Sequence, residues 1–335
     1  MTIQSLLSAL VDIPAPSGHE HSLRSFVQSM IQPHADYLGV DALGNLIARK
    51  GEKSKSGRRI MLAAHLDQIG LIVSHIDEQG FVRFTTLGGV PVHRFVGMRV
   101  RFLNGHCGVI ALEREVETKE RAPKVEKFFI DVGAEDRKNV PVRIGDVAVF
   151  DSGFREVGRR ILAPALDDRI GVALLIDHLC NAPTGPNEVY YVFTVQEEVG
   201  TRGAGPAAFG IDPEIGLAVD VTLAGDTPHA GVRNRVRLGG GPAIKVKDAG
   251  MISDPAVVDW MTRIAEEARI PHQFELLEGG TTDARAIQVA GPGVHSGALS
   301  IPTRYLHTPS EMIDMHDVEQ AQRFLGLLCQ SNFQA

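Results

Sequence analysis

The chain has 335 residues, of which 44% are hydrophobic and 22% are charged, and its formal net charge at pH 7 is -7. This composition is ordinary for a globular protein, and the length fits one large domain with an insertion, or two domains. Because no basic patch dominates the sequence, nucleic acid is excluded as an expected partner.

Cysteine usage and the N-terminal segment bear on the cellular compartment. Cys107, Cys180 and Cys329 are odd in number and include no CxxC pair, so neither a disulfide framework nor a thiolate zinc site is expected. The N-terminal segment has no basic region, and Asp12 and Pro14 interrupt its apolar stretch, so a signal peptide is not expected. No run reaches the ~20 apolar residues that span a bilayer. We therefore expect a cytoplasmic protein with no membrane partner.

The N-terminal part of the chain shows helix and strand patterns. Apolar residues recur at helical spacing over 3–11 and 20–31, which predicts two amphipathic helices. Short strands are predicted near 45–49 and over 59–64, and the second of them leads directly into His65. This mixture of elements is typical of an α/β domain.

From about residue 70 to about residue 160 the pattern changes to short strands and turns. Six apolar runs alternate with Gly, Asn and Pro turns, which predicts a small all-β barrel or sandwich. The charged stretch from Glu113 to Lys127 is predicted to be an exposed loop. The six runs are LIVSHI, FVRFTT, RVRFLN, CGVIAL, KFFIDV and DVAVF.

Helix and strand patterns return after residue 160. Asp167 or Asp168 can cap a helix that runs to about Cys180. The nearly continuous apolar runs at 188–195 and 215–219 predict central strands that are covered on both faces. These strands would belong to the same sheet as the strands before residue 70.

Two more helices complete the predicted fold. Asp254 followed by Pro255 is typical of a helix start, and a last helix is predicted over 317–329. The β-rich region therefore interrupts one α/β domain. The domain would comprise residues 1–69 and 161–335, with residues 70–160 as the insertion.

Acidic and imidazole residues occur at the points where strands are predicted to end. In open α/β sheets, ligands bind beyond the carboxyl ends of the strands, so side chains from distant segments can meet there. Two imidazoles together with several carboxylates suit a pair of divalent metal ions. The residues are His65, Asp67, Asp167, Asp168, Glu197, Glu198, Asp220 and His307.

The acid pair Glu197-Glu198 follows the apolar run that ends at Val195. Burying two carboxylates there is costly unless they have partners. One of them can bind a metal, while the other takes a proton from water that the metal activates. Asp220 is expected to end the next apolar strand in the same way.

The remaining candidates also have ordinary structural interpretations. His65 and Asp67 point to the same side of an extended chain, and a carboxylate beside an imidazole can hold its second ring nitrogen. One residue of the pair Asp167-Asp168 can cap the following helix, which leaves the other free to bridge two metals. His307 by itself would pass for a loop histidine, and only the joint occurrence of these segments favours a metal site.

Seven motifs, in order along the chain, carry a resemblance to a known family. From about residue 12 to residue 315 the chain is similar to the tetrahedral (TET) dinuclear-metal aminopeptidases, which include glutamyl and leucyl aminopeptidases. The resemblance implies a mixed-sheet, zinc-aminopeptidase-like α/β catalytic domain. The motifs are AHLDQIG, ALDDRIG, QEEVGTRGA, VDVTLAGDTP, GGGPAIKVKDAG, GGTTDARA and SIPTRYLHTPSEM.

The same resemblance implies a role for each site residue. Two divalent ions, Zn²⁺ or Co²⁺, would bind each chain, and both ions suit nitrogen and oxygen ligands. Asp283 lies in a family motif near the site without an assigned role. The implied roles are His65 and Asp220 on one metal, Glu198 and His307 on the other, Asp167 as the bridge, Glu197 as the general base, and Asp67 as the residue that orients His65.

The expected activity is removal of N-terminal residues from peptides with a free N-terminus. The resemblance also implies self-association into a homododecamer built from dimers. Because every proposed ligand lies outside the β insertion, the insertion is expected to serve assembly and not the metal site.

Three alternative functions remain open. A related dinuclear metallohydrolase, such as a small-amide deacylase or a carboxypeptidase, would act on substrates whose amine is blocked. A glycosidase would use the acid pairs without the histidines and would resist chelators. A non-catalytic metal-binding scaffold would have no use for Glu197.

Overall fold

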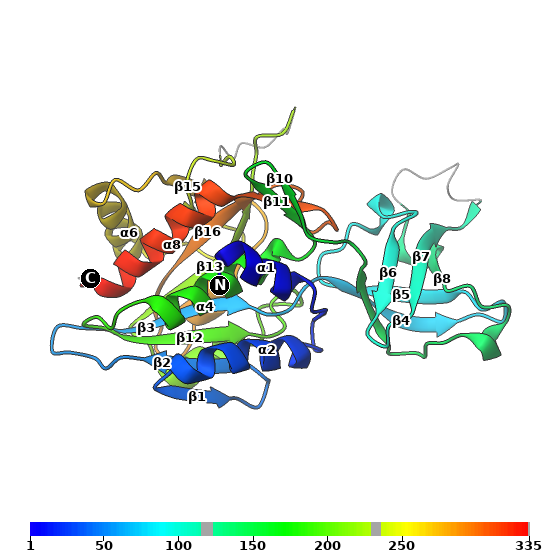
Figure 1. Cartoon of the computed structure of the whole chain (residues 1–335), viewed down its shortest axis with the longest axis horizontal. Helices are drawn as coiled ribbons and strands as arrows, with labels where there is room; N and C mark the ends of the chain where they lie inside the picture. The colour runs from blue at the N-terminus through cyan, green and yellow to red at the C-terminus, as the bar shows by residue number, and fades with distance from the viewer. Residues whose placement is uncertain (115–122, 229–235, 334–335) are drawn as a thin grey trace.

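The molecule has two main parts, an α/β domain built on a mixed sheet and a closed β-barrel, and Figure 1 shows them side by side. This computed structural model describes residues 1–114, 123–228 and 236–333. Much of the loop predicted between Glu113 and Lys127 therefore lies outside the described residues. The predicted fold class, an α/β domain with a β insertion, is confirmed.

The main sheet contains eight strands among the described residues. Its four central strands run parallel to one another, so their carboxyl ends lie at one edge of the sheet. In order across the sheet, the strands are β1 (Tyr37–Val40), β2 (Leu46–Lys50), β12 (Glu188–Thr194), β3 (Arg59–His65), β13 (Ile215–Leu223), β16 (His295–Thr303), β14 (Ala243–Lys247) and β15 (Gln273–Leu276).

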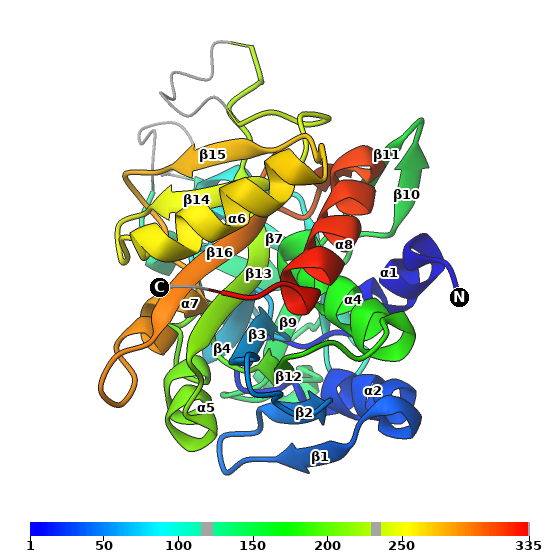
Figure 2. The same ribbon diagram turned by 90° about the vertical axis from the view of Figure 1, so that its left-hand side faces the viewer.

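Helices cover both faces of this sheet, as Figure 2 shows. The larger core cluster joins the sheet to α1, α2, α4, α6 and α8, and a smaller one joins it to α5 and α7. Double coverage explains why the central strands are almost continuously apolar. The helices are α1 (Ile3–Val11), α2 (His21–Ile31), α4 (Leu166–Asn181), α5 (Ala204–Ile211), α6 (Pro255–Glu267), α7 (Asp283–Gln288) and α8 (Met315–Gln330).

The predicted helices at 3–11, 20–31 and 317–329 match α1, α2 and α8 to within two residues at each end. Asp254 caps α6 by accepting a hydrogen bond from the Ala256 N–H. The helix α5 was not predicted, because its residues AGPAAFGI are apolar almost all round and show no amphipathic period. Within the described ranges, no helix is long and apolar enough to cross a membrane.

The insertion forms a closed antiparallel barrel of six strands in the part of the chain that the structure describes. Each of the six predicted runs supplies one strand. The barrel has its own core, in which Phe84, Phe102 and Phe128 are buried, so it does not depend on the main sheet for packing. The strands are β4 (Gly70–Ile76), β5 (Val82–Leu87), β6 (Arg99–Phe102), β7 (Cys107–Leu112), β8 (Phe128–Asp131) and β9 (Val147–Phe150).

The described residues also form a small three-stranded sheet. It consists of β10 (Arg155–Val157), β11 (Arg160–Ala163) and β17 (Glu311–Asp314), and β11 pairs with both of its neighbours. Ala163 pairs with Glu311, so the segment that leads into α4 is held beside the start of β17. The short 3-10 turns are η1 (Gln32–His34), η2 (Val92–Arg94), η3 (Val125–Lys127) and η4 (Arg137–Asn139).

Candidate active site

A cavity of about 760 Å³ opens at the carboxyl edge of the central strands. Segments that are far apart in the sequence meet in it, because they follow or lie within neighbouring parallel strands. Asp67 does not line the cavity but is fully buried nearby. The predicted site residues that line it are His65, Asp167, Glu197, Glu198, Asp220 and His307.

Asp167 lies between the two histidines. Its Oδ1 atom is 2.9 Å from Nε2 of His65, and its Oδ2 atom is 3.4 Å from Nε2 of His307. A second carboxylate accompanies each histidine: Asp220 Oδ1 is 3.9 Å from His65 Nε2, and Glu198 Oε2 is 3.5 Å from His307 Nε2. The residues therefore form two groups, each with one nitrogen and two carboxylates, that share Asp167.

The other ring nitrogen of each histidine contacts a backbone carbonyl. His65 Nδ1 lies 2.9 Å from the carbonyl oxygen of Asp67, and His307 Nδ1 lies 2.9 Å from that of Gly89. A carbonyl oxygen can only accept, so both Nδ1 atoms donate, and each ring directs its Nε2 atom at a carboxylate. Either a proton or a metal ion on Nε2 would compensate the charge of the facing carboxylate.

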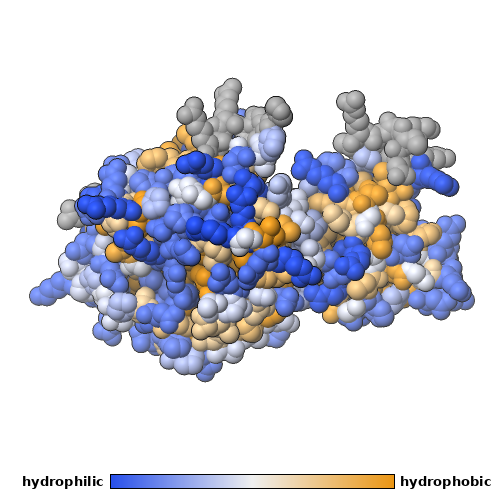
Figure 3. Space-filling model, turned by 45° about the horizontal axis from the view of Figure 1, so that its top comes forward, coloured by the Kyte–Doolittle hydropathy of each residue, from blue (hydrophilic) through white to orange (hydrophobic). Residues whose placement is uncertain are grey.

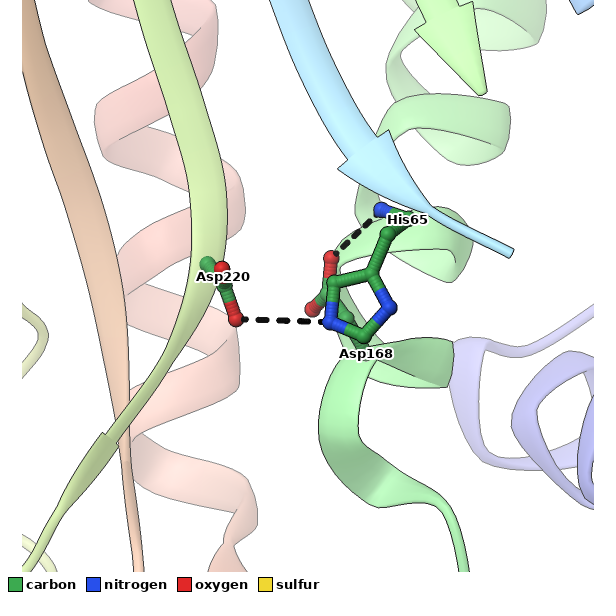
Figure 4. A group of neighbouring side chains, drawn as sticks. All are labelled: His65, Asp168 and Asp220. Atoms are coloured by element: carbon green, nitrogen blue, oxygen red, sulfur yellow. Dashed lines mark hydrogen bonds and ion pairs between the residues drawn. The ribbon is translucent and has the colours of Figure 1, made fainter. Parts of the chain in front are cut away.

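Asp168 lies beside His65 and Asp220, as Figure 4 shows, but its oxygens have other partners. Oδ2 accepts the backbone N–H of His65 at 3.2 Å, and Oδ1 accepts the N–H of Gly171 at 3.0 Å. Asp168 thus binds backbone N–H groups, including that of Gly171 in the first turns of α4, whereas Asp167 faces the cavity.

Two site residues lie in unexpected backbone positions. Asp220 was expected at the end of its strand, but β13 continues to Leu223 because it stays paired with β16. The prediction that Asp220 terminates the strand is therefore wrong. His307 lies in the loop between β16 and β17 and has a left-handed φ of 57°. Glycine is the residue that usually adopts this conformation, so the sequence did not predict it at a histidine.

The contacts of Asp67 differ from the expected ones. Its carboxylate Oδ1 is 3.7 Å from Nδ1 of His65, and the closer contact to that ring comes from the Asp67 backbone carbonyl. The carboxylate instead accepts the N–H of Glu197 at 2.8 Å, the N–H of Glu198 at 3.1 Å and the hydroxyl of Ser17 at 2.6 Å. Asp67 therefore holds the backbone of the acid pair in place.

The barrel reaches the site through the turn Gly88-Gly89, although the insertion was expected to serve assembly alone. Gly89 supplies the carbonyl that accepts from His307. A Cβ atom at Gly88 would lie 3.0 Å from Oε2 of Glu198, and Gly88 has a φ of 80°. Only a residue without a side chain allows this close approach. The sequence predicts turns between the strands of this region, but no pattern in it indicates that one of them contacts His307.

The cluster carries more negative charge than its imidazoles balance. Burial, reinforced by the charge of Asp167, raises the pKa of Glu198 to about 8 and that of Asp220 to about 7. Burial alone would lower the pKa of His65, yet the hydrogen bond and charge of Asp167 raise it well above its ordinary value. Divalent cations would supply the missing positive charge, so the donors present fit a metal centre.

The sequence of the chain is similar to those of known aminopeptidases. The family model described as M42 glutamyl aminopeptidase matches residues 44–324. The chain is 35% identical to a lysyl aminopeptidase of Pyrococcus furiosus, and the match covers 94% of this chain and 93% of the relative.

Two solved structures share the whole fold. An aminopeptidase from the archaeon Desulfurococcus kamchatkensis superposes with a TM-score of 0.93 at 39% identity, covering 98% of this chain and 94% of that one. A TET1 peptidase from Pyrococcus horikoshii, described as assembling into a tetrahedron or a large octahedral shell, superposes with a TM-score of 0.85 at 30% identity over 100% of both chains. The chain therefore belongs to the M42 glutamyl aminopeptidase family of peptide-bond hydrolases and has the TET aminopeptidase fold.

Proposed function

We propose that the protein is a dinuclear-metal aminopeptidase that releases the N-terminal residue of peptides with a free α-amine. One observation carries this proposal: Asp167 directs each of its oxygens at a different histidine, and each histidine has one further carboxylate beside it. A carboxylate in this position can bridge two cations, because its two oxygens can bind different ions.

The donors divide between two metal positions. His65 and Asp220 would hold the first ion, His307 and Glu198 the second, and Asp167 would be shared. The nitrogen and oxygen donors suit Zn²⁺ or Co²⁺. When bound, such ions lower the pKa of water and polarise a peptide carbonyl.

Glu197 is the proposed general base. It lines the same cavity, and Asp67 fixes its backbone. Burial, to which the charge of Asp283 adds, raises the pKa of Glu197 well above its usual value, and a raised pKa makes this carboxylate a stronger base. Glu197 accepts the proton of the attacking water and delivers it to the leaving amine.

Chelation and amine blocking test the proposed function together. We expect a chelator to lower the hydrolysis of an aminoacyl chromophore by at least about 100-fold, and we expect Zn²⁺ or Co²⁺ to restore it. The N-acetylated form of the same substrate should resist hydrolysis, because the free amine would have to bind in the site.

Each alternative function predicts a different result in this assay. Equal rates on the free and acetylated substrates would indicate a deacylase. Activity on oligosaccharides that resists the chelator would indicate a glycosidase. Metal binding without hydrolysis of either substrate class would indicate a non-catalytic scaffold.

We further propose that residues 70–160 form a domain through which the chain assembles, while residues 1–69 and 161–335 form the catalytic domain. The barrel exposes Val96, Met98 and Val109, each at least 40% accessible, and Figure 3 shows apolar surface over this part of the molecule. The TET1 relative, which assembles into closed shells, supports a homododecamer.

Light scattering checks the proposed assembly. We expect a particle of about twelve chains of 36.2 kDa. Val109→Lys should give smaller particles, because it places a charge in the apolar surface of the barrel. Phe209→Lys is the control, since Phe209 is 74% exposed on α5 of the catalytic part. A wild-type monomer at micromolar concentration, or equal disruption by both variants, would contradict this assignment.

A further inference from the structure

Glu311 is the first residue of β17, and its side chain is 1% exposed. Both of its carboxylate oxygens accept hydrogen bonds from the backbone of proposed metal ligands. Oε1 accepts the N–H of His307 at 2.8 Å, and Oε2 accepts the N–H of Asp167 at 3.0 Å. Glu311 therefore joins two ligand segments that lie far apart in the sequence, and the predicted roles did not include it.

His307 depends on such a contact for its backbone conformation. It has a φ of 57°, and Tyr305, two residues earlier, has a φ of 60°. A residue with a Cβ atom rarely adopts this conformation, and it persists only where several neighbours fix it. Glu311 holds the His307 N–H, and the Gly89 carbonyl holds the ring. These two contacts together determine where Nε2 points.

Asp167 has a related need. Its φ of -79° and ψ of 103° are not helical, although it lies in the first turn of α4. Backbone N–H groups at the start of a helix have no partner within the helix. Glu311 accepts this N–H, and the resulting position places Asp167 Oδ2 3.4 Å from Nε2 of His307.

We propose that Glu311 is a positioning residue that sets the affinity of the second metal position, the one formed by His307, Glu198 and Asp167. The proposal rests on the proposed dinuclear site. Glu311 itself is not a ligand, because backbone N–H groups occupy both of its oxygens. The first position depends on it less, since His65 ends β3 and Asp220 lies within β13, where strand pairing fixes the backbone.

Asp317 in α8 provides a matched control. It is fully buried, and its two oxygens accept the N–H groups of Gly239 and Gly241, each at 2.7 Å. Like Glu311, it connects two distant segments through backbone hydrogen bonds. Glu311→Gln and Asp317→Asn therefore make the same chemical change: an amide donor replaces one acceptor and faces a backbone N–H.

The experiment titrates metal-free wild type, Glu311→Gln and Asp317→Asn with Co²⁺, followed by calorimetry and by the absorption of the bound ion. We expect the second Co²⁺ to bind Glu311→Gln about 10- to 100-fold more weakly than wild type, because loss of an outer contact weakens a metal site by this factor. The first Co²⁺ should lose less affinity than the second, because Glu311 holds only one donor of the first position, Asp167. Asp317→Asn should bind both ions as wild type does, while its melting temperature falls.

Wild-type affinity for both ions in Glu311→Gln would overturn the proposal. An equal loss of affinity for the second ion in Asp317→Asn would also overturn it, because lower fold stability alone would then explain the effect. Glu311→Asp is a second test variant in case Glu311→Gln does not fold. It keeps the charge but is too short to hold both N–H groups, so it should also selectively lower the affinity for the second ion. A wild type that binds fewer than two ions would instead refute the proposed dinuclear site.

Discussion

Glu197→Gln lowers kcat by about 10²- to 10⁴-fold while the protein keeps both metal ions, if Glu197 is the general base. The amide has nearly the same shape as the carboxylate but cannot accept the proton of the attacking water. The backbone of residue 197 should stay in place, because its hydrogen bond to Asp67 comes from the main-chain N–H. Substrate binding should therefore change less than turnover.

The measurement compares kcat, KM and metal content by elemental analysis in Glu197→Gln and in its neighbour Glu198→Gln. Glu198 lies 3.5 Å from Nε2 of His307 and is a proposed ligand, so its amide variant should lose affinity for the second ion. The adjacent pair thus separates the two roles within one segment. Parallel loss of metal and activity in Glu197→Gln would show that Glu197 is itself a ligand.

Asp167→Ala should remove both metal ions and reduce hydrolysis below detection. Its two oxygens face the two histidines separately, so a single substitution takes a donor from each position. Removing that carboxylate also leaves the Nε2 atom of each imidazole without its nearest carboxylate. No other substitution at the site is expected to empty both positions.

Elemental analysis after dialysis checks this prediction against two reference variants. Asp220→Ala and His307→Ala each take a donor from one position, so each should retain about one ion per chain. Metal content should therefore decrease from wild type to these two variants and should be lowest in Asp167→Ala. Two tightly held ions in Asp167→Ala would rule out the shared-carboxylate arrangement.

The hydrophobic pattern of the sequence predicted the barrel strands and three of the four central strands of the main sheet, but not the fourth, β16. The runs at 188–195 and 215–219 are apolar on both sides because helices cover both faces of the sheet, and they correspond to β12 and β13. The barrel strands were equally visible, since turns separate them at short intervals. The helix α7 could not be predicted in this way, because six residues are too few to show a helical period.

The motifs named the segments that line the cavity, because carboxylates and imidazoles after apolar strands are unusual and chemically specific. They did not show how those segments hold one another. The carboxylate of Asp67 binds the backbone of Glu197, and that of Glu311 binds the backbone of Asp167. The carbonyl of Gly89 orients His307. Each contact joins a side chain to a main-chain group in a remote segment.

The sequence by itself determined the types of residue at the site, the order of the elements and the division between sheet and barrel. Tertiary structure alone decided which carboxylates face the cavity and which bind the backbone. The physical reason is that every residue except proline carries the same backbone N–H and C=O groups. The identity of a residue therefore does not show whether its main chain binds a remote side chain. Asp167 and Asp168 are adjacent and chemically identical, and only the folded backbone directs one to the cavity and the other to the start of α4.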